Sequence, residues 1–431
     1  MTGQAARPLA IRALLRFPTT TAVLAPYLLV ILPLALWNDT PGTDFILMTA
    51  ALAAGGAFAV EGALATIALT ERSLGPQGGT APRRGSVRSA APSLRWDGER
   101  VAVVARVVAV VSIVANVGAP ALGASTLQTQ VAGDVAGGFA GALTPFNAWG
   151  QVALALCITA HFLTGMTRPE TLTWVGALLA AQVAAAWISN ITVQLGSLTV
   201  LVVALFLMTR LVRPTITLTG VAVVAAAWPT VFAIRNALRL QNGIDVDESA
   251  TAAADRLRFD EQVVRAREFG AGHDLGQPDF WQALRYGLVP RILDPSRPPI
   301  SSGSAVNEFL GGTSTSAYTF LPVATVWFFW GALAVVLVYA SAAMAVCALR
   351  PWRSVEVRPV AMVLFVLLIG GPLSMLATPP DSFIKLLQTL VATAPVLLVL
   401  QVWARVRVEL PVEEPHPHPH PHPHPSLEPA R

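Results

Sequence analysis

Long apolar runs alternate with short polar segments along most of this chain. Each run is close to the ~20 residues that an α-helix needs to cross about 30 Å of hydrocarbon, and the runs lack the period-two alternation of a barrel strand. The pattern predicts an all-α polytopic membrane protein with about ten transmembrane helices. We place them at residues 20–37, 45–69, 101–122, 147–166, 171–188, 191–209, 215–234, 317–349, 359–377 and 383–403.

Polar segments divide these helices into groups. Residues 1–234 hold the first seven helices and include a linker at 71–97 that is rich in Gly, Pro, Ser and Arg. Residues 235–316 form one large charged loop, and residues 317–408 hold the last three helices. The tail at 409–431 alternates His and Pro, which favours an extended, disordered backbone.

Composition and charge support a membrane protein and indicate its orientation. Only 13% of the residues are charged, against about 25% in an ordinary soluble domain. The basic residues lie beside the predicted helices, so we expect contact with membrane lipids and no nucleic-acid partner. Arginines crowd the N-terminus and the 71–97 linker, whereas the short loops at 38–44 and 378–382 hold none. Positive charge in short loops stays in the cytoplasm, so we expect both termini there and the 235–316 loop outside.

The stretch VPRILDPSRPP, residues 289–299, is the most unusual part of the large loop. Its prolines restrict the backbone and hold Arg291 and Arg297 at a set separation. Two guanidinium groups held in this way suit a phosphate or diphosphate, because each can donate two parallel hydrogen bonds. The alternative is a rigid turn whose arginines pair with Asp294 and other nearby acids.

Three more basic side chains are expected at the same membrane face. Arg235 and Arg239 share one helical face at the end of the seventh helix. They are expected either to reach a lipid diphosphate or simply to extend into the headgroup region. Lys385, near Asp381 at the outer start of the tenth helix, is a further candidate for contact with a diphosphate.

Two other expectations concern charged side chains. Glu61 of the second helix and Arg106 of the third should form an inter-helix pair, because an isolated charge inside a bilayer costs roughly 2.5–3.5 kcal/mol. In the large loop, residues 245–270 predict a helix with acids at its start and Gly270 at its end. Its thin apolar stripe suits the membrane surface or the mouths of the transmembrane helices.

The segment LVPRILDPSRPPISSGSAVNEFLGGTSTSAYTFLPVATVWFFWG resembles the last large extracytoplasmic loop of O-antigen polymerases of the Wzy type. In that family a proline–arginine run with a further basic residue precedes a polar segment and the start of a helix with aromatic residues and glycine. Arg297 stands where a lysine is more usual, which keeps the charge but changes the hydrogen-bond geometry. The matching residues are Pro290, Arg291, Pro295, Arg297, Pro298, Asn307, Thr315, Tyr318, Phe320 and Gly331.

The resemblance implies a metal-independent glycosyltransferase of the bacterial cytoplasmic membrane, similar in architecture to the large helical enzymes that use lipid-linked sugars. Such an enzyme polymerises polyprenyl-diphosphate-linked oligosaccharide repeat units into a surface polysaccharide on the outer side of the membrane, without a cofactor. The lipid-linked oligosaccharide would be its substrate. Proteins that export the polysaccharide or set its chain length would be its partners.

The implied reaction needs two kinds of side chain. Cations must stabilise the diphosphate leaving group as negative charge builds on it, and a general base must accept the proton of the acceptor hydroxyl. The candidates for the first role are Arg291, Arg297, Arg235, Arg239 and Lys385. The candidates for the second role are Asp294, Glu308 and His273.

Two other functions fit the same set of helices. A secondary transporter or flippase of lipid-linked sugars would leave the large charged loop unexplained, and the sequence shows no convincing inverted halves. A ligase that moves glycan from a lipid to another acceptor would share the diphosphate site. The sequence contains no Walker loop, nucleotide fingerprint or metal-ligand cluster, so ATP-driven transport by this chain is not expected.

Overall fold

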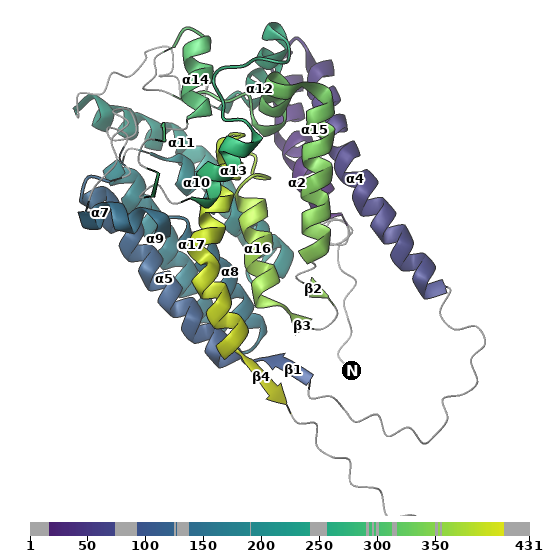
Figure 1. Ribbon diagram of the computed structural model, residues 1–431. Helices are drawn as coiled ribbons and strands as arrows, with labels where there is room; N and C mark the ends of the chain where they lie inside the picture. Colours follow the sequence, from purple (N-terminus) through teal and green to yellow (C-terminus); the bar gives the residue numbers. More distant parts are fainter. Residues whose placement is uncertain are drawn as a thin grey trace, which may run out of the picture.

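A computed structural model gives the fold, which is almost entirely helical (Figure 1). Several predicted features lie outside the residues that it describes, namely the N-terminal arginines, most of the 71–97 linker, Arg291 and the 409–431 tail. The described residues are 17–73, 93–124, 126, 138–189, 191–241, 257–289, 293–294, 297–298, 301–312, 317–349, 352–353 and 356–408.

The elements follow the predicted apolar runs closely. In chain order they are α2 (Pro18–Pro26), η1 (Tyr27–Ile31), α3 (Leu32–Trp37), α4 (Thr43–Ser73), β1 (Ser93–Trp96), α5 (Gly98–Ala121), α7 (Gly138–Leu143), η2 (Thr144–Phe146), α8 (Trp149–Phe162), α9 (Arg168–Ser189), α10 (Val193–Thr209), α11 (Pro214–Gln241), α12 (Phe259–Phe269), α13 (Phe280–Leu288), α14 (Ser302–Phe309), α15 (Pro322–Leu349), β2 (Trp352–Arg353), β3 (Glu356–Val357), α16 (Pro359–Gly370), α17 (Asp381–Trp403) and β4 (Arg405–Val408).

Each of the ten predicted segments contains a helix, but the helices differ in length. Within the described residues, seven are long and apolar enough to cross a membrane, with α2, η1 and α3 counted as one. Helix α8 continues from the Phe139–Phe146 helix across a bend of 44°. Helices α10 and α16 have 17 and 12 residues. At 1.5 Å per residue α16 is only about 18 Å long, and an irregular, mostly buried segment follows it.

Close helix packing depends on small residues. Helices α4 and α15 lie side by side, with α2 against both, and α5 packs on α8 and α9 (Figure 1). At Gly56 of α4 a Cβ atom would lie 2.5 Å from the carbonyl oxygen of Val336 in α15. The two backbones therefore approach as closely as they do only because Gly56 has no side chain, as is common in membrane helix pairs.

The predicted ion pair between Glu61 and Arg106 is wrong. Glu61 is buried and accepts hydrogen bonds from the N–H of Thr19 (2.7 Å) and from the N–H (3.2 Å) and hydroxyl (2.7 Å) of Thr20. The first amides of a helix have no partner within it, so this carboxylate caps α2 from a neighbouring helix. Arg106 pairs with Glu170 of α9 instead, at 2.7 Å.

A short antiparallel ribbon lies at the end of the molecule opposite α12 and α14 (Figure 1). Strand β1 pairs with β4, so that Trp96 lies opposite Arg405 and Ser93 lies opposite Val408. Residues 93–96 were predicted as part of a flexible linker, and they form a strand because β4 supplies the backbone partners. The ribbon joins the start of α5 to the end of α17. Strands β2 and β3 form a separate two-stranded hairpin.

Helix α15 is interrupted at Gly331, where φ is +78° and ψ is −177°. This region of backbone conformation is readily available only to glycine. The eighth predicted helix is therefore a short piece followed by a long one. The interruption deprives carbonyl groups in the turn before Gly331 of their usual partners four residues ahead, which makes them available to other segments.

Candidate functional site

Helix α13 lies against the first two turns of α17. Its start is fixed by a capping box, in which the Asp279 carboxylate accepts from the Gln282 N–H at 2.7 Å and the Gln282 side chain accepts from the Asp279 N–H at 3.1 Å. Near its end a Cβ atom at Gly287 would lie 2.6 Å from the side chain of Leu387 in α17. This contact leaves α13 little freedom to move across α17.

Arg297 is held in place by α13. Its Nη1 donates a hydrogen bond to the Tyr286 carbonyl, and its guanidinium lies 5.6 Å from the centre of the Tyr286 ring. Gln388 of α17 donates to the same carbonyl at 2.9 Å. Arg297 and Gln388 are therefore neighbours, and the proline-rich stretch is brought to the face of α17.

Asp294 is buried and forms an ion pair with Arg285 of α13 at 2.8 Å. The rigid-turn alternative expected Asp294 to pair with the arginines of its own stretch. The ion-pair partner described here is Arg285, which lies on α13 instead. Because its carboxylate already accepts from a guanidinium, Asp294 is better suited to positioning this segment than to taking a proton.

Two residues of α17 complete this group. Asp381 is buried and accepts hydrogen bonds from the N–H of Ser302 at 3.0 Å and from its hydroxyl. Lys385, one turn later, is exposed, and its ammonium has no polar partner within the described part of the chain. Positions 381, 385 and 388 fall on one face of the helix. We use the name α13–α17 site for Arg285, Asp294, Arg297, Asp381, Lys385 and Gln388.

His273 lies in a loop that docks on the interruption in α15. The N–H groups of Gly272 and His273 donate to the Phe328 carbonyl at 2.9 and 3.2 Å, which occupies a carbonyl made available near Gly331. The imidazole stacks on the Phe328 ring with 4.5 Å between centroids. Its Nε2 lies 2.8 Å from the Phe269 carbonyl. A carbonyl can only accept, so we assign the proton to Nε2, which leaves Nδ1 of the neutral ring with its lone pair.

Helix α14 connects the His273 loop with the α13–α17 site. Ser302 at its start bonds to Asp381, and Phe309 at its end lies 5.1 Å from His273 between ring centroids. Seven residues of helix separate the two ends by about 10 Å. Glu308, on the last turn, is exposed. The described contacts therefore bring Asp294 and Arg297 to α13, beside Gln388 of α17 and about one turn from exposed Lys385. His273 and Glu308 lie at the far end of one short helix.

Arg235 and Arg239 have a different setting, at the end of α11. Arg235 donates to the Thr192 hydroxyl at 3.5 Å, beside the start of α10, and to the Asn236 side chain at 3.1 Å. Its guanidinium also lies 4.1 Å from the centre of the Phe232 ring. Arg239, one turn later, is half-buried. These contacts hold the end of α11 against the start of α10, so they give Arg235 a structural role.

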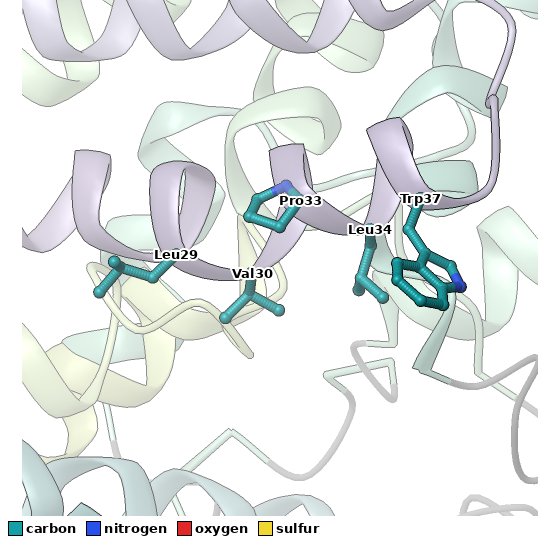
Figure 2. Close-up of a pocket in the computed structure, with 5 residues that line it drawn as sticks. All are labelled: Leu29, Val30, Pro33, Leu34 and Trp37. Carbon is teal, nitrogen blue, oxygen red and sulfur yellow. The ribbon is translucent and has the colours of Figure 1, made fainter.

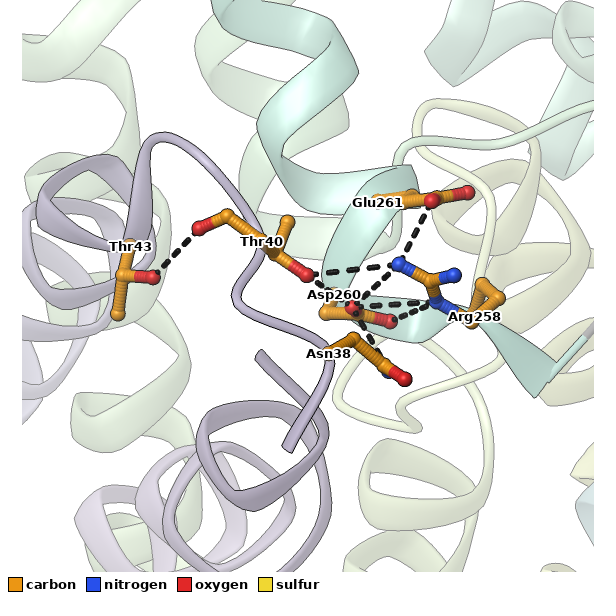
Figure 3. A network of polar contacts seen from close by, with 6 residues as sticks. All are labelled: Asn38, Thr40, Thr43, Arg258, Asp260 and Glu261. Atoms are coloured by element: carbon orange, nitrogen blue, oxygen red, sulfur yellow. Dashed lines mark hydrogen bonds and ion pairs between the residues drawn. The ribbon is translucent and has the colours of Figure 1, made fainter. Parts of the chain in front are cut away.

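A buried network around Asp260 holds α12 in place, and sequence reasoning missed it (Figure 3). The Asp260 carboxylate accepts from the Thr40 hydroxyl, from Asn38 (3.3 Å) and from Arg258 (3.1 Å), and Arg258 also pairs with Glu261 at 2.6 Å. Burial opposes its ionisation, but these donors outweigh burial and hold the pKa of Asp260 below its usual range. The predicted 245–270 helix thus begins at Phe259 in the described residues, and its apolar stripe packs on the helix mouths.

A shallow groove elsewhere does not have the chemistry of a binding site for a charged substrate. It has a volume of ≈ 350 Å³ and is lined by Leu29, Val30, Pro33, Leu34 and Trp37, all from one helical segment (Figure 2). Leu29 and Trp37 are 75% and 87% exposed. This surface suits contact with lipid chains.

Comparisons with protein-family models, with curated proteins and with solved structures found no match to this chain.

Proposed function

We propose that this protein is a glycosyltransferase that polymerises polyprenyl-diphosphate-linked oligosaccharide repeat units on the outer side of the bacterial cytoplasmic membrane. The observation that carries the proposal is the α13–α17 site, where Arg297 lies beside Gln388 and exposed Lys385 lies one turn earlier, near the start of the same apolar helix. A lipid diphosphate lies at the boundary between hydrocarbon and water, which is where the end of such a helix would present these cations.

The side chains of the site would have two roles, which are binding of the diphosphate and positioning of the residues that bind it. Arg297 and Lys385, with Arg291 contributed by the same stretch, would bind the diphosphate and stabilise its charge as the bond to the sugar breaks. Asp294 and Asp381 would position them by holding α13 and α14. The resemblance to O-antigen polymerases supports the same assignment, because its proline–arginine motif contains Arg297.

The proposed reaction transfers the donor glycan to a hydroxyl of the acceptor sugar. The oxygen of an acceptor sugar hydroxyl forms a bond to the anomeric carbon of the donor, and the bond from that carbon to the diphosphate oxygen breaks. The leaving diphosphate takes the bonding electrons, and the acceptor proton passes to a base. His273 is the candidate that the geometry favours, because its Nε2 hydrogen bond leaves Nδ1 able to accept a proton.

The test uses the full chain in detergent with a short lipid-linked repeat unit. A polymerase yields a ladder of longer lipid-linked glycans, a ligase moves glycan to another carrier, and a flippase makes no new covalent product. Arg297→Ala should slow ladder formation by about ten- to a hundred-fold, because a charge-assisted hydrogen bond is worth roughly 1.5–3 kcal/mol. Arg297→Lys should be milder because it keeps the charge.

The matched control is Arg358→Ala, which removes an exposed arginine at the N-cap of α16, away from the α13–α17 site. It should leave the ladder unchanged. Normal ladders from Arg297→Ala at normal folded yield would reduce the stretch to a rigid turn and remove the main support for the proposal.

A further inference from the structure

Two Arg–Trp pairs cross between the joined ends of α5 and α17. The Arg100 guanidinium lies 5.6 Å from the centre of the Trp403 ring, and the Arg405 guanidinium lies 5.1 Å from that of Trp96. In each pair one residue comes from β1 or α5 and the other from β4 or α17. The four side chains are therefore held relative to one another by the strand pairing itself.

The position of these pairs is that of a membrane boundary. Helix α5 begins at Gly98 and α17 ends at Trp403, and both are long and apolar enough to cross a bilayer. Tryptophan and arginine at the ends of such helices lie at the level of lipid headgroups. Trp403 is 42% exposed, so this end of the bundle presents an aromatic and basic surface.

The two arginines are engaged to different degrees. Arg100 donates to the Trp403 carbonyl at 2.7 Å and pairs with Asp97 at 3.2 Å. Arg405 is exposed, and within the described residues the N–H groups of its guanidinium have neither a hydrogen-bond nor an ion-pair partner. A guanidinium that stacks by its face on an indole still offers its N–H edge, and that edge matches two phosphate oxygens.

We propose that the β1–β4 ribbon is a binding site for the headgroup phosphate of an anionic phospholipid, with Arg405 as the phosphate donor and Trp96 as its support. The positive charge of exposed Arg405 favours an anionic over a zwitterionic lipid. The occupant is a lipid because the site lies at the end of two apolar helices. This inference does not depend on the proposed glycosyltransferase function.

The test is native mass spectrometry of the full chain in detergent, titrated with phosphatidylglycerol or with phosphatidylcholine. The unaltered protein should bind phosphatidylglycerol more tightly. Arg405→Ala should weaken that binding about five-fold, as expected for one arginine at a membrane surface, and should weaken phosphatidylcholine binding less, because the choline cation already offsets the phosphate charge. Trp96→Leu should weaken it as well, because the guanidinium loses the surface that orients it.

Arg265→Ala is the matched control, since it removes one exposed arginine from α12 at the opposite end of the molecule. Equal losses in Arg265→Ala and Arg405→Ala, or no loss in Arg405→Ala, would overturn the site. Displacement of the lipid by millimolar inorganic phosphate would also overturn it, because the site would then bind a free ion. If Arg405→Ala does not elute as a folded protein, Arg405→Gln takes its place under the same criteria.

Discussion

Three buried carboxylates act as ties between segments that are distant in the sequence. Glu61 caps α2, Asp260 holds the turn before α4, and Asp381 holds the start of α14. Each is surrounded by donors rather than by a single opposite charge. Removing such an acceptor leaves buried donors unsatisfied at a cost of roughly 1–3 kcal/mol each, so these residues determine how the elements are docked.

Acid should loosen α12 within a defined pH window. A carboxyl whose pKa is lower in the folded state stabilises that state fully above its unfolded value, about 3.9, and this contribution is lost as the pH falls through the folded value. Because the pKa of Asp260 is held low, the docking of α12 should be constant down to about pH 5 and weaken below about pH 4. Hydrogen exchange of the α12 amides, corrected for intrinsic rates, measures this.

Asp260→Asn is the control for that experiment. It should loosen α12 already at neutral pH by about 1–3 kcal/mol and abolish the acid step, because the titrating group is gone. An unchanged acid step in the variant would assign the effect to another carboxyl.

At the scale of elements, neighbouring glycines of α4 test the packing against α15. Gly56→Ala should destabilise the protein by at least about 1–3 kcal/mol, because the added methyl group would meet the Val336 carbonyl. Gly55→Ala meets nothing within 4 Å and should be neutral or slightly stabilising, since alanine favours a helix. Melting temperatures in detergent compare the two, and equal effects would contradict the described helix contact.

The interruption of α15 makes a second prediction at this scale. Gly331→Ala forces a side chain into a conformation that costs roughly 1–3 kcal/mol, so the helix should straighten and reclaim the Phe328 carbonyl. The loop at Gly272 and His273 should then lose its anchor, and its amides should exchange faster. Gly220→Ala in α11, where a Cβ meets nothing within 4 Å, should not change that exchange.

Hydropathy predicted the helices well, because twenty apolar residues in a bilayer satisfy their backbone only as a helix. It could not predict which partner a charged side chain takes. Glu61 and Arg106 were expected to pair with each other, but Glu61 accepts from the amides of α2 and Arg106 pairs with Glu170. Such choices depend on how the helices are rotated and shifted against one another, which a single sequence does not encode locally.

The candidate site shows the same limit, because its residue types could be read from the sequence but their partners could not. The prolines and arginines of residues 289–299 indicated a rigid basic segment, and Lys385 was expected nearby. The role of Gln388 was not foreseen because it depends on α13 lying on α17, and that of Arg285 was not foreseen because it depends on how Asp294 packs beside α13. Gly331 was noted as part of a motif, but its backbone conformation and the loop that docks beside it appear only in three dimensions.

At the scale of the whole molecule, the basic ribbon and the α12–α14 region lie at opposite ends (Figure 1). In a background with Cys157→Ala and Cys347→Ala, we introduce cysteine at Glu268 on α12 and at Glu99 on α5, both exposed. An impermeant maleimide should label intact cells at position 268, and at position 99 only after permeabilisation. The reverse result would put the α13–α17 site in the cytoplasm and contradict the proposed function.

The register of the β1–β4 ribbon has a mechanical consequence. The chain enters β1 at Ser93 and leaves β4 at Val408, and these two residues face each other. Tension applied between the preceding segment and the following tail would therefore peel the strands apart one rung at a time. The Trp96–Arg405 rung would open last, so the ribbon would yield before any load reached α5 or α17.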